Sequence, residues 1–238
     1  MRTDQILFAV FVAALFAAVV STAGRYLGAR TASAVAVFLL VWFACVGVLV
    51  YSGRLANTNA VPPGMAFILG PVIVFIFAMS FFTFSRKSIW PFAFPLWLLI
   101  GFQSFRVIVE MFIHRLWLEG LVPQLLTYRG ANIDIYIGLS APFIAWWSTR
   151  SATGRKFALV WNLLGLAALA NVVSRAIMTA PGALNFIHAE PPNRMFVSFP
   201  YLFIPALCVP LAVTLHIVSL RVLTRRPQSS HGAQSKAT

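Results

Sequence analysis

Long runs of apolar residues, separated by short polar connections, occupy most of the 238-residue sequence. Each run approaches the ~20 residues with which an α-helix crosses a bilayer, where lipid offers no partner to an unpaired backbone N–H or C=O. The pattern predicts seven transmembrane helices, over residues 5–23, 31–51, 63–84, 91–115, 133–149, 157–178 and 197–220. The expected fold is an all-α, polytopic integral membrane helix bundle.

Composition supports a protein that is solvated by lipid. Hydrophobic residues make up 60% of the chain and charged residues only 10%, too few to cover a water-soluble globule. We therefore expect the bilayer as a partner and a single transmembrane domain over residues 1–220. Residues 221–238, in which Arg225, Arg226 and Lys236 stand among Ser, Gln and Pro, are predicted to be a disordered basic cytoplasmic tail.

The formal net charge of +13 changes the picture less than it would in a soluble protein. Basic residues lie mainly in the short connections, where they set topology, so we predict no nucleic-acid binding. Eleven fall in the first, third and fifth connections or the tail: Arg25, Arg30, Arg86, Lys87, Arg150, Arg155, Lys156, Arg221, Arg225, Arg226 and Lys236. Six fall on the opposite side: Arg2, Arg54, Arg115, Arg129, Arg175 and Arg194. The asymmetry predicts an external N-terminus and a cytoplasmic C-terminus.

The first apolar run has some features of a secretory signal, with Ser21-Thr22-Ala23 as a small-residue cleavage site. Cleavage there would place the basic connections outside, against the positive-inside rule, so we expect the helix to be retained. Cys45 and Cys208 each lie within an apolar run, which is typical of small buried hydrophobic residues.

A polar stripe in the fourth predicted span is the best candidate for chemistry. Gln103, Arg106, Glu110 and His114 recur at steps of three, four and four, which places them on one face of a helix. Ionisable groups within a span are costly and normally face the bundle interior or a cavity. Two interpretations stay open: an Arg106–Glu110 ion pair at i, i+4 that only lowers the insertion cost, or a stripe that lines a functional cavity. Counted from Phe92, Arg106 lies ~20 Å along the helix, toward the outer side.

The connection after this span adds further polar candidates. Its apolar residues, including Leu121 and Leu125, alternate with polar ones up to Asn132 and Asp134, so it is expected to lie at the outer interface and to roof a pocket. Gly120 and Pro123 should interrupt any continuous helix there.

In this region the chain resembles an uncharacterised family of bacterial multi-pass membrane proteins. The shared pattern is Arg106, Glu110, His114, Glu119-Gly120, Val122-Pro123, Thr127, Gly130, Asn132 and Asp134-Ile135. The resemblance covers residues 100–142, with weaker likeness as far as the seventh span. It implies a multi-pass protein of the bacterial inner membrane and brings no activity, cofactor or substrate.

The favoured function is binding or translocation of a small polar or anionic solute through an outward-facing pocket. Arg106 would be the charge partner and Glu110 and His114 the proton-coupled groups, with Gln103, Asn132 and Asp134 completing the site. One alternative is a membrane enzyme or metal-binding subunit that uses Glu110, His114, His188 and Glu190. Another is an accessory or assembly protein whose stripe pairs with a second subunit. The sequence identifies no cofactor and leaves oligomeric state open, but a retinal Schiff base is excluded because no lysine lies within a span.

Overall fold

A computed structural model describes residues 3–57 and 63–225, and this part of the chain is built from helices and turns. The α-helices are α1 (Thr3–Leu27), α2 (Ala29–Tyr51), α3 (Ala66–Phe84), α4 (Leu96–Gly101), α5 (Phe105–Leu118), α6 (Asp134–Arg150), α7 (Ala152–Met178) and α8 (Val209–Leu223). Short helical turns are η1 (Arg54–Ala56), η2 (Trp90–Ala93), η3 (Phe102–Ser104), η4 (Gln124–Leu126), η5 (Met195–Val197) and the π-helical η6 (Ile204–Cys208). The predicted all-α fold is confirmed.

Several of these elements are continuous with one another and form longer helical segments that can cross a membrane. We call each membrane-crossing segment a rod. α4, η3 and α5 run on as one segment, Leu96–Leu118, and η6 continues into α8 as Ile204–Leu223. With α1, α2, α3 and α7 these make six segments, within the described residues, that are long and apolar enough to span a bilayer. α6 has 17 residues and rises ~26 Å, slightly less than the ~30 Å hydrocarbon core, so a seventh span stays a prediction. The chain is a multi-pass membrane protein.

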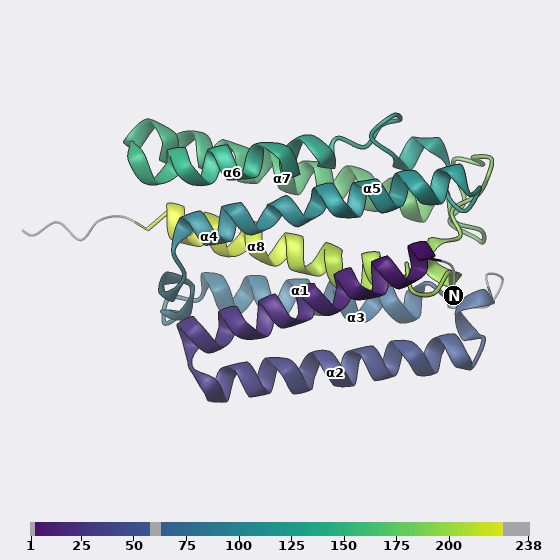
Figure 1. Cartoon of the computed structure of the whole chain (residues 1–238), viewed down its shortest axis with the longest axis horizontal. Helices are drawn as coiled ribbons and strands as arrows, with labels where there is room; N and C mark the ends of the chain where they lie inside the picture. The colour runs from purple at the N-terminus through teal and green to yellow at the C-terminus, as the bar shows by residue number, and fades with distance from the viewer. Residues whose placement is uncertain (1–2, 58–62, 226–238) are drawn as a thin grey trace, which may run out of the picture.

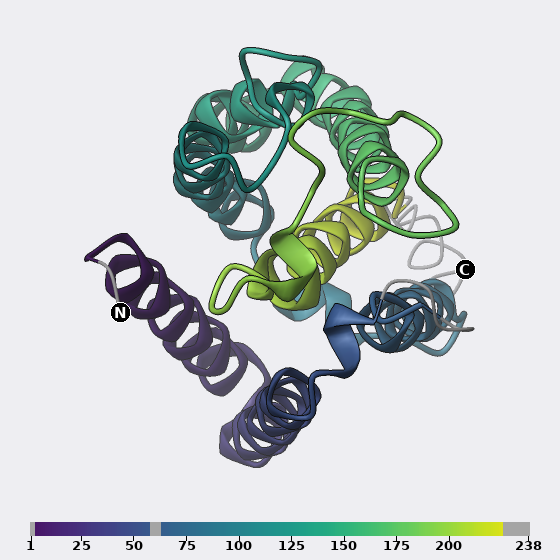
Figure 2. The same cartoon turned by 90° about the vertical axis from the view of Figure 1, so that its right-hand side faces the viewer.

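The rods lie roughly parallel in one bundle (Figure 1). α8 lies near the middle, where it packs on α3, α4 and α7, and α6 packs on α4, α5 and α7. α1 and α2 pack mainly on each other and lie at the edge of the bundle, as the end-on view shows (Figure 2). The surface is strongly apolar, with Val74, Phe77 and Phe81 about 70% exposed on α3, as expected for helices in contact with lipid.

The starts of three rods differ most from the predicted starts, and each difference has a local reason. The fourth begins at Leu96, not residue 91, because η2 and the extended residues Phe94 and Pro95 precede the helix. The last begins at Ile204, not residue 197, since η5 and turns around Pro200 precede it. α7 begins earlier than predicted, at Ala152, because the Ser151 hydroxyl caps it by accepting a hydrogen bond from the Gly154 backbone N–H (2.9 Å).

The predicted interruption between the fourth and fifth spans is also seen. α5 ends at Leu118, and Gly120 has a φ of 72°, a left-handed conformation that suits glycine. Val122 and Leu126 of this connection are buried, and the Leu121 carbonyl accepts a hydrogen bond from the Arg194 N–H (2.8 Å). The two long connections at this end of the bundle are thus joined. Of the predicted basic tail, residues 226–238 lie outside the described residues, whereas Arg221 belongs to α8.

Candidate functional site

The polar stripe of the fourth rod turns inward for most of its length. Gln103, Arg106 and Glu110 are at most 3% exposed and face α6 and α8. His114, one turn further on, is only half-buried, and its ring packs against Trp117 and Tyr128 with centroid separations of 5.2 and 4.8 Å. The structure therefore groups three of the four predicted stripe residues and leaves His114 in an aromatic cluster at the end of α5.

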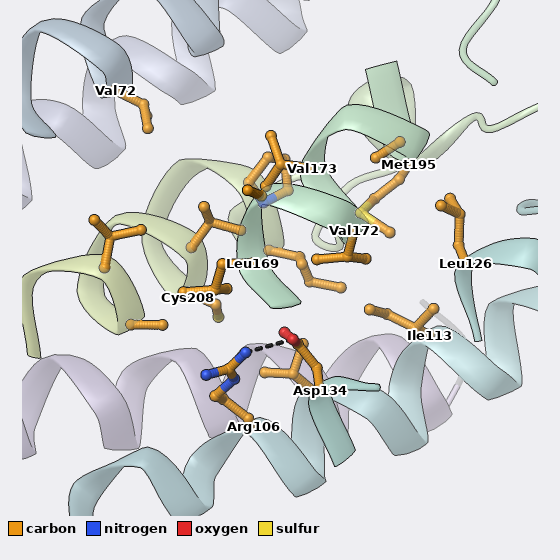
Figure 3. Close-up of a pocket in the computed structure, with 18 of the residues that line it drawn as sticks. Val72, Arg106, Ile113, Leu126, Asp134, Leu169, Val172, Val173, Met195 and Cys208 are labelled. Carbon is orange, nitrogen blue, oxygen red and sulfur yellow. Dashed lines mark ion pairs between the residues drawn. The ribbon is translucent and has the colours of Figure 1, made fainter. Parts of the chain in front are cut away.

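Arg106 pairs with Asp134 in the first turn of α6 (Figure 3). The intrahelical partner expected from the i, i+4 spacing was Glu110, and the ion pair formed by Arg106 is with Asp134 instead. Arg106 and Glu110 do lie on one face of α5, as predicted. The start of α6 crosses that face, however, and brings the Asp134 carboxylate to the Arg106 guanidinium. The N-terminal end of α6 is also a favourable place for a negative charge.

A second contact of Arg106 involves a residue that sequence reasoning did not include. Its Nη1 lies 2.9 Å from His216 Nε2 on α8, and His216 Nδ1 lies 2.8 Å from Asn162 Oδ1 on α7. A guanidinium can only donate, so Nε2 accepts from Arg106 and Nδ1–H donates to Asn162, which defines the tautomer of a neutral imidazole. Asn162 Nδ2 in turn donates to the Ala158 carbonyl (2.7 Å).

Asn132 links Glu110 to the start of α6. Its Nδ2 donates to Glu110 Oε1 (2.6 Å) and to the Leu126 carbonyl (2.9 Å), while its Oδ1 accepts from the Asp134 N–H (3.0 Å). Gln103 links its helical segment to α8, since its Nε2 donates a hydrogen bond to the Ala212 carbonyl (3.0 Å). We refer to Gln103, Arg106, Glu110, Asn132, Asp134, Asn162 and His216 as the buried polar cluster.

Two glycines make room for this cluster. A Cβ at Gly165 of α7 would lie 2.2 Å from His216 Cε1 and 2.4 Å from Nε2, closer than side-chain atoms approach one another. A Cβ at Gly138 of α6 would lie 2.8 Å from Val107 Cγ2 and 3.4 Å from Arg106 Cβ. The absence of a side chain at both positions lets α6 approach α5, and α7 approach α8, closely enough for the cluster to form.

A cavity of about 260 Å³ adjoins the cluster. Its walls are apolar side chains from α3, α5, α7, η6 and α8, among them Val72, Leu169, Val173 and Cys208 (Figure 3). Among the described residues, the charged side chains on its wall are Arg106, Glu110 and Asp134. The predicted pocket residues Gln103, Asn132 and His114 do not line it, although Gln103 and Asn132 hold the groups that do.

The residues of the alternative metal site are not brought together. His188 and Glu190 lie in the connection between α7 and α8, apart from Glu110 and His114 on α5. Within residues 3–57 and 63–225, no group of three or more His, Cys, Asp and Glu side chains is placed to hold a metal ion.

His216 and Asn162 were not among the residues predicted to form the site, and Arg106 was expected toward the outer end of its span. Arg106 is ten residues beyond Leu96, where the rod begins, so it lies ~15 Å along the rod and close to its middle. The depth of Arg106 along its helix was overestimated because it was counted from Phe92, which belongs to η2. The one available signal for His216 and Asn162 was their polarity within apolar spans.

No curated protein matches the chain, and no solved structure matches it. A family described as a domain of unknown function (DUF8737) matches residues 62–224, a range that includes α3 to α8 and the whole buried polar cluster. This agrees with the resemblance to an uncharacterised membrane protein family seen in the sequence. The chain is a multi-pass membrane protein that belongs to the DUF8737 family.

Proposed function

We propose that this protein binds a small solute in the cavity beside Arg106, Glu110 and Asp134 and passes it across the membrane. The observation that carries the proposal is the composition of the cavity wall, which is apolar except for these three buried charged side chains. A pocket with apolar walls and a few convergent polar groups is the usual form of a small-molecule site. Ionisable groups at membrane depth commonly mark such sites and pathways.

The geometry favours an amphipathic solute over the polar or anionic one expected from the sequence. Arg106 was expected to attract an anion, but its charge is offset by Asp134 and one of its N–H groups is used by His216. Little attraction for a further anion is left. The extensive apolar wall supports a solute with an apolar body, whose single polar group meets the charged end of the cavity.

Translocation would be assisted by Glu110 as the group that exchanges a proton. Glu110 belongs to the cavity wall and is 2% exposed. His114, the other proposed proton-coupled group, is outside the wall and packs on Trp117 and Tyr128, so we assign it a positioning role at the end of α5.

We further propose that the N-terminus is outside and the C-terminus cytoplasmic, in a bacterial inner membrane, with the cavity in the outer half of the bundle. The eleven-to-six distribution of basic residues supports this orientation. Residue 57 is exposed and directly follows η1, which packs on η5 in the connection between α7 and α8. With Cys45 and Cys208 replaced by Ser, an Asn57→Cys variant should react with an impermeant thiol reagent from outside. Reaction only from the cytoplasmic side would contradict the orientation.

Solute-dependent thermal stabilisation of the detergent-purified protein tests the binding step, because a ligand of the folded state raises the unfolding midpoint. Val173→Trp places a large side chain in the cavity and should abolish the shift produced by any solute that binds there. Val160→Trp is the matched control, since Val160 lies on the same helix, 52% exposed on its outer surface. Equal shifts in the two variants would show that the solute binds elsewhere.

A further inference from the structure

The carboxyl group of Glu110 is incompletely satisfied within the protein. Oε1 accepts a hydrogen bond from Asn132, but Oε2 is buried and has no donor within the described part of the chain. A buried acceptor without a donor is energetically unfavourable, and more so when it is charged, so such atoms usually accept a hydrogen bond from a ligand or water. Because Glu110 belongs to the cavity wall, a molecule bound in the cavity can donate the missing hydrogen bond to Oε2.

The charges around the cavity indicate what kind of donor is preferred. One guanidinium, Arg106, faces two carboxyl groups, Asp134 and Glu110. The remaining members of the buried polar cluster are amides and an imidazole that accepts from Arg106, and these add no charge. With both carboxyl groups ionised, the cluster has an excess of one negative charge. A cationic donor both balances this charge and satisfies Oε2, whereas an anion does neither.

The cavity also reaches the surface of the bundle that faces lipid. α3 and α7 both pack on α8 and stand on either side of it without packing extensively on each other (Figure 2). Ile73 of α3 and Ala170 of α7 line the cavity and are exposed on this outer surface. The space between α3 and α7 therefore forms a lateral mouth at membrane depth.

The size of the cavity limits the apolar part of the ligand. A cavity of ~150 Å³ in another protein accommodates benzene, so 260 Å³ corresponds to a ligand of roughly ten heavy atoms. A molecule with an apolar body of this size partitions into the bilayer, from which the lateral mouth is directly accessible.

We propose that the ligand is an apolar amine of about this size, which enters from the bilayer between α3 and α7 and places its ammonium group against Glu110 Oε2. This inference rests on the proposed function and specifies its ligand class and route. Glu110 is the residue that contacts the ammonium group, while Asp134 balances Arg106 and Asn132 holds Glu110 in place.

Three probes of matched length test the class: octylamine, octanol and octanoate, titrated against the full-length protein in detergent with the thermal midpoint as readout. Octylamine should stabilise the protein at lower concentration than the other two. Glu110→Gln keeps an oxygen for Asn132 and removes the charge, so it should weaken octylamine binding roughly tenfold or more. Glu119→Gln removes a carboxylate that is outside the cavity wall and should leave octylamine binding unchanged.

The outcomes separate the two proposals. Equal or tighter binding of octanol or octanoate in a cavity that Val173→Trp closes would overturn the amine class and leave solute binding standing. Stabilisation by none of the probes would also overturn the amine class, and solute binding then depends on the wider solute screen. If Glu110→Gln fails to fold, loss of octylamine binding in Val173→Trp but not in Val160→Trp still supports the site, and equal binding in both overturns it.

The lateral route has its own test in phosphatidylcholine vesicles. Ala170→Trp narrows the mouth, whereas Ala167→Trp places the same side chain on an exposed position of α7 outside the cavity wall. Octylamine added from the lipid phase should associate more slowly with the first variant than with the second. Equal association rates would overturn entry between α3 and α7.

Discussion

The α1–α2 hairpin and the α5–α8 region are built for different surroundings although both consist of apolar helices. α1 and α2 have mean hydropathies of 2.6 and 2.7. In the most apolar stretch of each helix, only 22% of the residues of α1 and 11% of those of α2 are buried. In the rod Leu96–Leu118, with a lower mean hydropathy of 1.7, half are buried. The more hydrophobic helices are therefore the more exposed ones, because lipid rather than the protein interior solvates them.

Buried polarity is distributed in the opposite way. Within the described residues of α1 and α2 no polar or charged side chain is buried, whereas all seven members of the buried polar cluster lie between Gln103 and His216. The family match covers residues 62–224 and so includes the cluster but neither α1 nor α2. Hydropathy thus reports which surface meets lipid, and polar groups within the spans indicate where helices converge on a site.

The largest expected effect contrasts two arginines that join helices by ion pairs. Arg106→Met leaves Asp134 buried without its partner and should destabilise the protein by about 3–5 kcal/mol. Arg115→Met removes a pair with Asp4 of α1, at 3.1 Å, in which the arginine side chain is 57% exposed, and should cost at most about 1 kcal/mol. Reversible unfolding in mixed micelles measures both. Similar losses in the two variants would break the contrast between the regions.

A smaller effect is expected from glycine substitutions in the two regions. Gly165→Ala pushes a methyl group into the His216 ring, which two hydrogen bonds hold in place, and should cost about 1–3 kcal/mol. Gly47→Ala, in the middle of α2, meets no atom within 4 Å and should be neutral or stabilising by up to about 1 kcal/mol. Thermal midpoints of the purified variants compare them, and a harmless Gly165→Ala would show that the α7–α8 contact is looser than described.

The smallest effect concerns the attachment of the hairpin. Trp42 of α2 donates its indole N–H to the Ala206 carbonyl (2.9 Å), and the residue four positions after Ala206 is Pro210, which has no N–H to offer. Trp42→Phe should therefore cost about 1 kcal/mol, the usual contribution of one hydrogen bond. Trp97→Phe, at a position 51% exposed, should change the midpoint very little. A neutral Trp42→Phe would mean that packing alone holds the hairpin.

Much of the fold follows from the sequence because the bilayer imposes one length and one type of secondary structure on apolar runs. The stripe of Gln103, Arg106 and Glu110 was predictable for a similar reason, since helical periodicity alone places these residues on one face. Their partners were predictable only in part, since Asp134 was placed in the same pocket but His216 was not. Spacing reports neighbours on the same helix, so it suggested Glu110 for Arg106, while the actual contacts with Asp134 and His216 depend on how α6 and α8 cross the rod.

The nature of the cavity was equally inaccessible to sequence reasoning. The polar stripe predicted a polar pocket, but Gln103, Arg106 and Glu110 each bond to other residues of the protein. The space beside them is walled by apolar residues such as Val72 and Leu169. Two glycines, Gly138 and Gly165, permit the close helix approach that creates the cluster, and nothing in their local sequence distinguishes them from Gly47 or Gly70. These features arise from packing between helices distant in sequence.

A double-mutant cycle on Arg106 and Asp134 tests most directly whether a charge pair joining α5 to α6 forms the polar end of the cavity. The cycle uses Arg106→Met, Asp134→Asn and the double variant, with free energies of unfolding measured in the same mixed micelles. Each single variant should be strongly destabilised and the double variant should recover much of the loss, which corresponds to a coupling energy of about 2 kcal/mol or more. A coupling energy near zero, with additive losses in the double variant, would contradict the pair and the site built on it.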